Sequence, residues 1–217
     1  MRQHPTTTSS DRPPIDGLAL TRLDPADYGR APWKNGGGVT IDIAALYRDG
    51  AVAGSWNGLV WRLGRTAIVA PAPFSDLSGH DRQQVVVTGR GLVLDTPEGE
   101  IDLREPFRPT GYDGGLSIVS RLEDGPVEVV NLIADRNLAR VALAVLHEGS
   151  ALFLQPGTHI VYAAAGPIAF EVDGAATPLA HDQALRIDAA RPLKLRGEAG
   201  RGLIASIYPT TTETPSA

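Results

Sequence analysis

The chain has 217 residues with 20 Lys and Arg against 25 Asp and Glu, which gives a formal net charge of -5, and it contains no cysteine. This charge argues against a general nucleic-acid or anionic-membrane surface, because such surfaces need clustered Lys and Arg and the sequence has no such cluster. Without cysteine, neither disulfide bonds nor thiolate chemistry is available, which fits a reducing compartment.

Both ends of the chain are polar. Residues 1–16 are rich in Thr, Ser and Pro, and residues 209–217 have a similar composition, so we expect a disordered tail at each end. The first residues have no apolar run, so they do not indicate a secretory signal. No apolar stretch reaches the roughly 20 residues that a membrane-spanning helix needs. We therefore expect a cytoplasmic protein.

The first element expected after the tail is a short helix. Asp24 is a favoured N-cap residue, and Pro25 suits the first helical position. Gly29 and Pro32 follow closely and limit this helix to a turn or two.

The segment from Pro32 to Thr40 places a Trp, a Lys and an Asn directly before three consecutive glycines. Consecutive glycines let the backbone adopt positive φ and approach a bound group closely. Lys34 and Lys194 are the only lysines among basic residues that are otherwise arginines, which hints at a chemical need for Lys34. From Val39 to Ala44, apolar and polar residues alternate with the period of a half-buried strand. Because phosphate-binding glycine loops lead into a helix, a nucleotide-binding loop is not indicated.

Short apolar runs separated by Gly, Pro and Asp fill the rest of the chain, which is typical of an antiparallel sandwich or barrel. The Gly89-Arg90-Gly91 segment before one such run predicts a hairpin turn. The segments Gly91–Gly99 and Gly166–Gly174 form a weak internal repeat with the same interval between their glycines. These patterns predict an all-β chain with two related halves.

Four groups of residues occur in an order and spacing that resemble the HutD/Ves family of cupin-like proteins. They are Tyr28 with the Pro32–Thr40 segment; Trp61, Arg62 and Leu63; Pro73, Phe74 and Ser75 with Gly79, Asp81 and Arg82; and Gly125, Pro126 and Val127 with Asn131 and Arg136. The resemblance implies an all-β, bicupin-like double-stranded β-barrel or jelly roll with few short helices. Its first barrel is expected at 17–140 and its second half at 141–208. Asp42 stands where the family pattern has Glu, and Val129-Val130 stands where it has Asp-Phe.

Many cupins hold a metal, but this sequence offers no ligand set for one. Its five histidines are scattered, and none forms a His-x-His or His-x-x-x-His pair. Ser75, His80 and Asp81 lie close in sequence without a nucleophile-elbow motif, which fits a turn better than a catalytic triad. We therefore expect no metal, no cofactor and no catalytic residue of these kinds.

The remaining polar residues are suited to binding a small anion. Lys34 is a flexible cation, and the planar Arg62 guanidinium matches a carboxylate. Arg62 shares a strand face with Gly64 and Thr66, and Thr40 shares one with Asp42. This face could line a barrel mouth, or it could be a solvated outer face on which Arg62 and Asp42 form an ordinary ion pair. The candidate ligand-binding residues are Trp33, Lys34, Asn35, Gly36, Gly37, Thr40, Arg62, Asp81, Arg82 and Asn131.

The family resemblance implies an accessory or regulatory role in histidine utilisation. We expect the pocket to bind a small carboxylate metabolite, with N-formylglutamate or a related intermediate of that pathway as the candidate. Two alternatives stay open, namely a small-molecule hydrolase or isomerase with Lys34 or Asp81 as general base, and a ligand-free protein-interaction scaffold. No direct nucleic-acid or membrane partner is expected. The sequence leaves the oligomeric state open, a homo-oligomer included.

Overall fold

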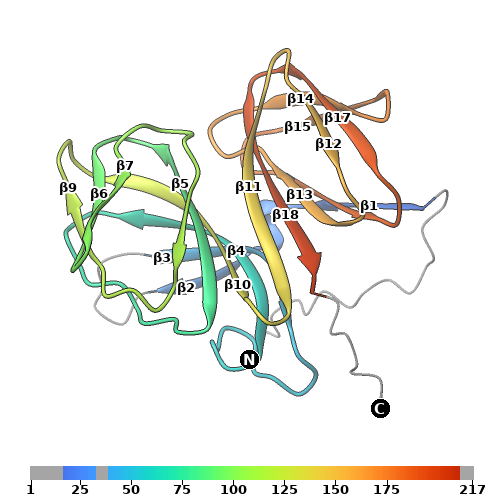
Figure 1. Ribbon diagram of the computed structural model, residues 1–217. Coiled ribbons are helices and arrows are strands. Elements are labelled where there is room, and N and C mark those ends of the chain that lie inside the picture. The colour runs from blue at the N-terminus through green and yellow to red at the C-terminus, as the bar shows by residue number, and fades with distance from the viewer. Residues whose placement is uncertain (1–16, 33–38, 211–217) are drawn as a thin grey trace.

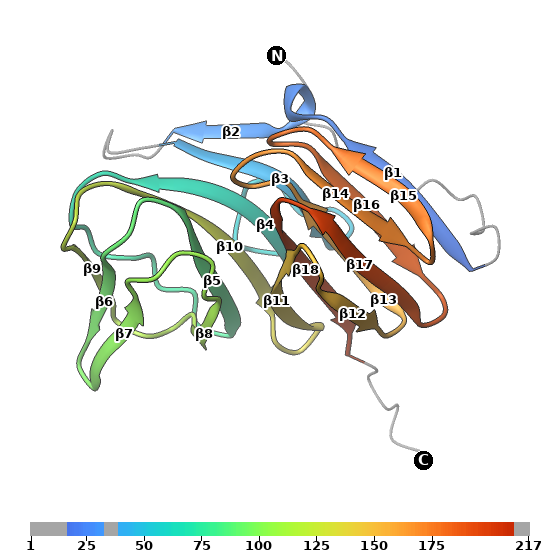
Figure 2. The same cartoon turned by 90° about the horizontal axis from the view of Figure 1, so that it is seen from above.

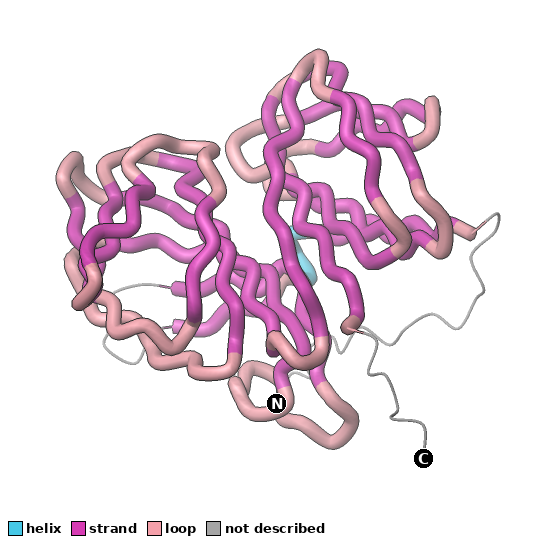
Figure 3. Tube along the Cα trace, in the orientation of Figure 1, coloured by secondary structure: helices cyan, strands magenta, loops and turns pink. Residues whose placement is uncertain are grey.

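The computed structural model describes residues 17–32 and 39–210, which are built almost entirely from β-strands (Figure 1). Helical structure among them is limited to one 3-10 turn, η1 (Pro25–Asp27), drawn in cyan in Figure 3. Within these ranges no helix has the length and apolar character needed to cross a membrane. The predicted all-β class is confirmed.

The strands form four sheets whose edges stay open. The strand bounds are β1 (Leu18–Leu23), β2 (Gly29–Pro32), β3 (Val39–Tyr47), β4 (Leu59–Ile68), β5 (His80–Thr88), β6 (Leu92–Thr96), β7 (Gly99–Leu103), β8 (Thr110–Asp113), β9 (Val119–Leu122), β10 (Val127–Asp135), β11 (Ala139–His147), β12 (Ala151–Leu154), β13 (Gly157–Tyr162), β14 (Ile168–Val172), β15 (Ala175–Leu179), β16 (Ala184–Ala189), β17 (Leu193–Ala199) and β18 (Arg201–Pro209). One half of the molecule pairs a six-stranded sheet of order β2-β3-β4-β10-β5-β8 with a three-stranded sheet of order β7-β6-β9. The other half pairs a five-stranded sheet of order β1-β16-β13-β18-β11 with a four-stranded sheet of order β12-β17-β14-β15.

Each half is thus a β-sandwich, and the two sandwiches lie side by side (Figure 2). Buried apolar side chains fill the space between the sheets of the second half and part of that space in the first. β1 pairs with β16 from Leu18 to Leu23, so this strand adds to the second half, although the predicted division placed it with the first. β11 begins at Ala139, close to the predicted start of the second half at position 141.

The internal repeat corresponds to two similar hairpins. In the first half β6 and β7 pair across a turn that ends at Gly99, and in the second half β14 and β15 pair across a turn that ends at Gly174. Both glycines have positive φ, which a turn residue with a side chain rarely adopts. The repeat therefore reflects a shared local structure at matching places in the two sandwiches.

Two local predictions have different outcomes. Asp24 caps η1 as expected, because its Oδ1 accepts a hydrogen bond from the backbone N–H of Ala26 at 2.9 Å. Gly89 and Gly91 form a turn with φ of 75° and 81°, but the predicted hairpin is wrong, since β5 and β6 do not pair. The turn packs against Pro126, whose carbonyl oxygen would lie 2.5 Å from a Cβ at position 89. It carries the chain from the six-stranded sheet to the three-stranded one.

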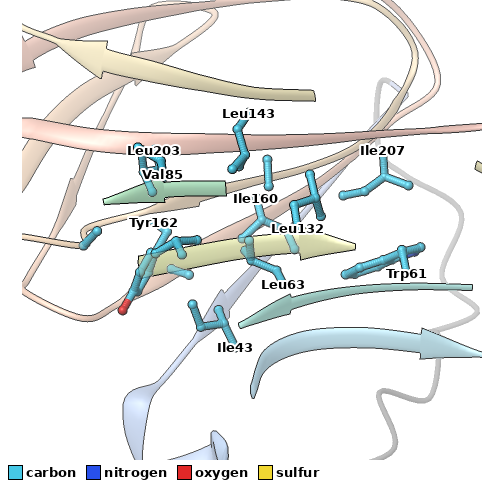
Figure 4. Packing of buried hydrophobic residues seen from close by; sticks show 14 of the residues in the cluster. Ile43, Trp61, Leu63, Val85, Leu132, Leu143, Ile160, Tyr162, Leu203 and Ile207 are labelled. Carbon is cyan, nitrogen blue, oxygen red and sulfur yellow. The ribbon is translucent and has the colours of Figure 1, made fainter. Parts of the chain in front are cut away.

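An extensive apolar cluster joins the two halves (Figure 4). The residues labelled there come from both facing sheets: Ile43, Trp61, Leu63, Val85 and Leu132 from the first half, and Leu143, Ile160, Tyr162, Leu203 and Ile207 from the second. Full burial of a large apolar side chain contributes roughly 1.5–3 kcal/mol, so this seam is a main source of stability. Because Trp61 and Leu63 face the seam, the alternating residues of β4 face the interior of the first sandwich.

A polar cluster also holds the seam. The Asp182 carboxylate of the second half lies 3.0 Å from Arg65 Nη1 on β4, and it accepts a short hydrogen bond from the Tyr162 hydroxyl. The Tyr28 hydroxyl donates to the Asp182 backbone carbonyl at 2.8 Å. Burial is the main cause that raises the pKa of both tyrosines, so they remain neutral donors. One turn of the second half therefore binds both β4 and the residue that precedes β2.

Candidate functional site

A cavity of about 520 Å³ lies inside the first sandwich, on the face of the six-stranded sheet opposite the seam. Its floor comes from β3, β4, β10 and β5, and the segment 72–77 together with Trp56 forms its walls. The lining residues are Thr40, Trp56, Arg62, Gly64, Thr66, Ile68, Ala72, Pro73, Phe74, Ser75, Leu77, Arg82, Gln84, Val129, Asn131 and Ile133. Its volume is that of a small-molecule site.

The strand register sets out the polar residues of the floor in two rows. Ile133 of β10 lies opposite Arg62 of β4 on one side and opposite Arg82 of β5 on the other. In the next row of the same face, Asn131 lies opposite Gly64 and Gln84. The predicted strand phase, with Arg62, Gly64 and Thr66 on one face, is confirmed, and that face lines a cavity.

Arg82 is the most unusual residue of the cavity, because it is a buried cation without a carboxylate partner among the described residues. The residue is 7% exposed, and its guanidinium carbon lies 4.9 Å from the Phe74 ring centre and 5.3 Å from that of Tyr112. Its Nη2 donates to Asn131 Oδ1 at 3.3 Å, while its buried Nε has no hydrogen-bond partner among the described residues. Burial lowers the pKa of the Arg82 guanidinium, although an arginine stays charged at neutral pH.

Gln84 adds a second unused donor beside Arg82. The residue is 0% exposed, and its Oε1 accepts a hydrogen bond of 2.6 Å from the Tyr112 hydroxyl. Burial raises the pKa of Tyr112 to about 12, so the hydroxyl keeps its proton and acts as the donor. The Gln84 Nε2 then has no partner in the described part of the chain. A buried donor without a partner costs about 1–3 kcal/mol. The Arg82 guanidinium, which lines the cavity and has no carboxylate partner among the described residues, is suited to an oxyanion.

At the other end of the floor, Arg62 is already neutralised. Its Nε donates to Asp42 Oδ1 at 2.5 Å, and the guanidinium carbon lies 5.2 Å from the centre of the Trp56 ring. A Cβ at position 64 would lie 3.1 Å from the Ile41 carbonyl oxygen and 3.4 Å from Asp42 Oδ1, so glycine suits this closely packed part of the floor. The ion pair considered from the sequence is therefore present, but it lies in the cavity region and not on a solvated outer face, since the Arg62 side chain is 11% exposed.

The structure brings four of the candidate residues together and separates one. Thr40, Arg62, Arg82 and Asn131 line the cavity, with Thr40 Oγ1 3.3 Å from Thr66 Oγ1. Asp81 does not line it: the alternation of β5 turns its side chain away from that of Arg82, and its carboxylate lies 3.0 Å from Arg136 Nη2. The remaining candidates, Trp33, Lys34, Asn35, Gly36 and Gly37, lie outside the described residues.

The predicted set lacks several residues of the site, among them Gln84, Trp56 and Tyr112. Gln84 follows Arg82 by two positions, so the period of a strand could have indicated it. Trp56 comes from the β3–β4 connection and Tyr112 from β8, and nothing in their local sequence indicates that they pack over the two arginines.

The groups considered for metal or triad chemistry do not converge. Among residues 17–32 and 39–210, no three His, Asp or Glu side chains are placed to hold a metal ion. Ser75 lines the cavity, whereas Asp81 pairs with Arg136 and His80 Nδ1 lies 3.4 Å from the Ser78 carbonyl oxygen. The buried His159 uses both ring nitrogens within the second half, at 2.9 Å from Ser206 Oγ and 2.9 Å from the Gln155 carbonyl oxygen.

Comparison with known proteins identifies the family. The sequence model of the HutD family matches residues 25–205. The chain belongs to the HutD family. A curated relative from Pseudomonas putida, described as an uncharacterised 21.2 kDa protein in the hutC 3' region, is 28% identical over 155 residues, which cover 71% of this chain and 79% of the relative.

Two solved structures extend this likeness to the fold of the HutD-family chain. HutD from Pseudomonas fluorescens is 27% identical with a TM-score of 0.72, and the match covers 88% of this chain and 100% of that one. A conserved protein of unknown function from Pseudomonas aeruginosa is 25% identical with a TM-score of 0.74, covering 89% and 100% of the two chains.

Proposed function

We propose that this HutD-family protein binds a small carboxylate in the cavity of its first half and acts as an accessory or regulatory factor in histidine utilisation. The observation that carries the proposal is the buried Arg82 guanidinium, which has no carboxylate partner among the described residues. A buried unpaired charge is costly for a folded protein, whereas a bound carboxylate would compensate it with a charge-assisted hydrogen bond.

The aromatic faces of Phe74 and Tyr112 contact the Arg82 guanidinium and limit its orientation. The guanidinium and the amide of Asn131, both at the cavity lining, then offer donors to one carboxylate group. N-formylglutamate or a related intermediate of histidine degradation is the candidate ligand, on the strength of the family. The glycines that follow Lys34 and Asn35 end at Gly38, two residues before Thr40 of the cavity floor, and we include Lys34 in the proposed site on its sequence alone.

We further propose that the two sandwiches are the two units of a bicupin-like chain and that the protein works in the cytoplasm. Two repeated hairpins in matching sheets support the first statement. The absence of cysteine supports the second.

Isothermal titration calorimetry tests the proposed binding. Parent protein is titrated with formate, acetate and N-formylglutamate, and we expect saturable binding of at least one of them below millimolar concentration. Arg82→Met should abolish this binding, whereas Arg90→Met, at an exposed arginine that pairs with Asp124, should leave it unchanged. Lys34→Ala should weaken it. Equal binding by parent and Arg82→Met, or none by the parent, would refute the proposal.

The cavity itself favours ligand binding over the scaffold alternative, since a scaffold needs no hollow lined by a cation without a carboxylate partner among the described residues. Asp81 is a poor general base for a ligand held there, because its carboxylate is on the other side of β5 and is bound to Arg136. An enzyme that uses Lys34 would be recognised by turnover of a bound acid that is lost in Lys34→Met.

A further inference from the structure

Arg62 and Arg82 occupy equivalent positions in the cavity but differ in their electrostatic state. Each lies opposite Ile133 in the strand register, on either side of β10. With strands spaced about 4.8 Å apart, their Cα atoms are about 10 Å from each other. Arg62 is bound to Asp42, whereas Arg82 has no acidic partner in the described part of the chain.

We propose that Asp42 is a specificity-determining residue that limits the cavity to one carboxylate; this inference rests on the proposed carboxylate binding. Asp42 occupies the Arg62 guanidinium and contributes a negative charge of its own at that end of the floor. A second carboxylate of the ligand would have to displace Asp42 from Arg62 and would be repelled by it. Arg82, at the other end, is then the single uncompensated cation of the described lining.

The two ends of the cavity therefore recognise different chemistry. The Arg82 end takes a carboxylate, while the end formed by Arg62, Trp56 and the paired hydroxyls of Thr40 and Thr66 takes an uncharged group with hydrogen-bonding capacity. The ligand class that fits is a monocarboxylate with a neutral polar or planar far end. Because N-formylglutamate has two carboxylates, this role of Asp42 favours a related intermediate with a single carboxylate over N-formylglutamate itself.

Removal of the Asp42 charge tests this assignment. Dissociation constants of propionate, a monocarboxylate, and glutarate, a dicarboxylate, are measured by calorimetry for the parent and for Asp42→Asn. Because freed Arg62 becomes a second anchor, the affinity for glutarate relative to propionate should rise at least about tenfold, the lower end of what close charge pairs contribute across an interface. Asp42→Glu keeps the charge and supplies the residue expected from the family pattern, so it should leave the ratio near that of the parent.

The double variant Asp42→Asn with Arg62→Gln separates a local anchor from a general change of charge. The gain in glutarate affinity should disappear in it, because the second anchor is gone. A gain that persists without Arg62, or a ratio that does not change in Asp42→Asn, would overturn the role of Asp42.

A second experiment tests the role of Asp42 and does not require that Asp42→Asn folds. Arg62→Gln leaves Asp42 as an uncompensated negative charge near the floor, so propionate should bind about tenfold more weakly than to the parent. Unchanged propionate affinity would overturn the inference while the carboxylate site at Arg82 stands. If the parent binds neither probe, the proposed function fails and this inference fails with it.

Discussion

Replacement of Arg82 by Met should make the protein more stable and unable to bind its ligand. Met is flexible and apolar and is about as long as the aliphatic part of Arg, so Arg82→Met removes the charge and keeps an apolar side chain near Phe74 and Tyr112. The variant removes the penalty of an unpaired buried ion, which is about 4 kcal/mol.

Three favourable contacts are lost at the same time. The two cation–π contacts contribute about 1 kcal/mol each, and the 3.3 Å hydrogen bond to Asn131 contributes about 1 kcal/mol. The difference is a gain of about 1 kcal/mol in the free energy of unfolding, or a rise in Tm of about 2–4 °C for a chain of this size.

Differential scanning fluorimetry with and without a binding carboxylate measures both effects. At a ligand concentration of 100 times Kd the parent should gain about 2.7 kcal/mol, which corresponds to a rise in Tm of about 5–10 °C. The variant should start from a higher Tm and show no ligand-dependent rise. A variant that is less stable than the parent by more than about 2 kcal/mol and still responds to ligand would refute the reasoning, because Arg82 would then be structural.

Three further results are expected. Asp182→Asn should lower the free energy of unfolding by about 2 kcal/mol in urea denaturation, because it leaves the largely buried Arg65 without its carboxylate. Asn tolerates the left-handed φ of 68° at this position, so the backbone is not strained. An unchanged midpoint would show that the apolar seam alone holds the halves. Burial lowers the pKa of His159, so below pH 6.5 the unfolded state binds the proton more readily than the folded state. Stability should therefore fall as pH decreases from 6.5 towards the folded pKa. His159→Gln should reduce this pH dependence in urea titrations between pH 7.5 and 5.5. Hydrogen bonds from Arg104 and Arg121 lower the pKa of Glu123 to about 2. In Arg104→Gln the midpoint of this carboxyl group, measured by an NMR titration of its carboxyl carbon, should rise towards that of an ordinary Glu. Equal midpoints in the two proteins would contradict the pairing.

Part of the site followed from strand periodicity. Alternation along 61–66 placed Arg62, Gly64 and Thr66 on one face, and the structure has them on the cavity floor. The same reasoning did not anticipate that Asp81 and Arg82 would be divided between two faces, although neighbouring strand residues point in opposite directions. In the fold, Asp81 belongs to an exposed ion pair with Arg136, whereas Arg82 is a buried cation.

The sequence alone determined the all-β class, the capped turn at Asp24 and the period of the strands, because these depend on local backbone preferences and on the two-residue repeat of a pleated chain. The tertiary structure decided which arginine lacks a counter-charge. Asp42 reaches Arg62 through the register between β3 and β4, and no acidic residue among those described reaches Arg82 between β8 and β10. Charge compensation depends on distances across strands far apart in the chain, and only the folded register fixes them.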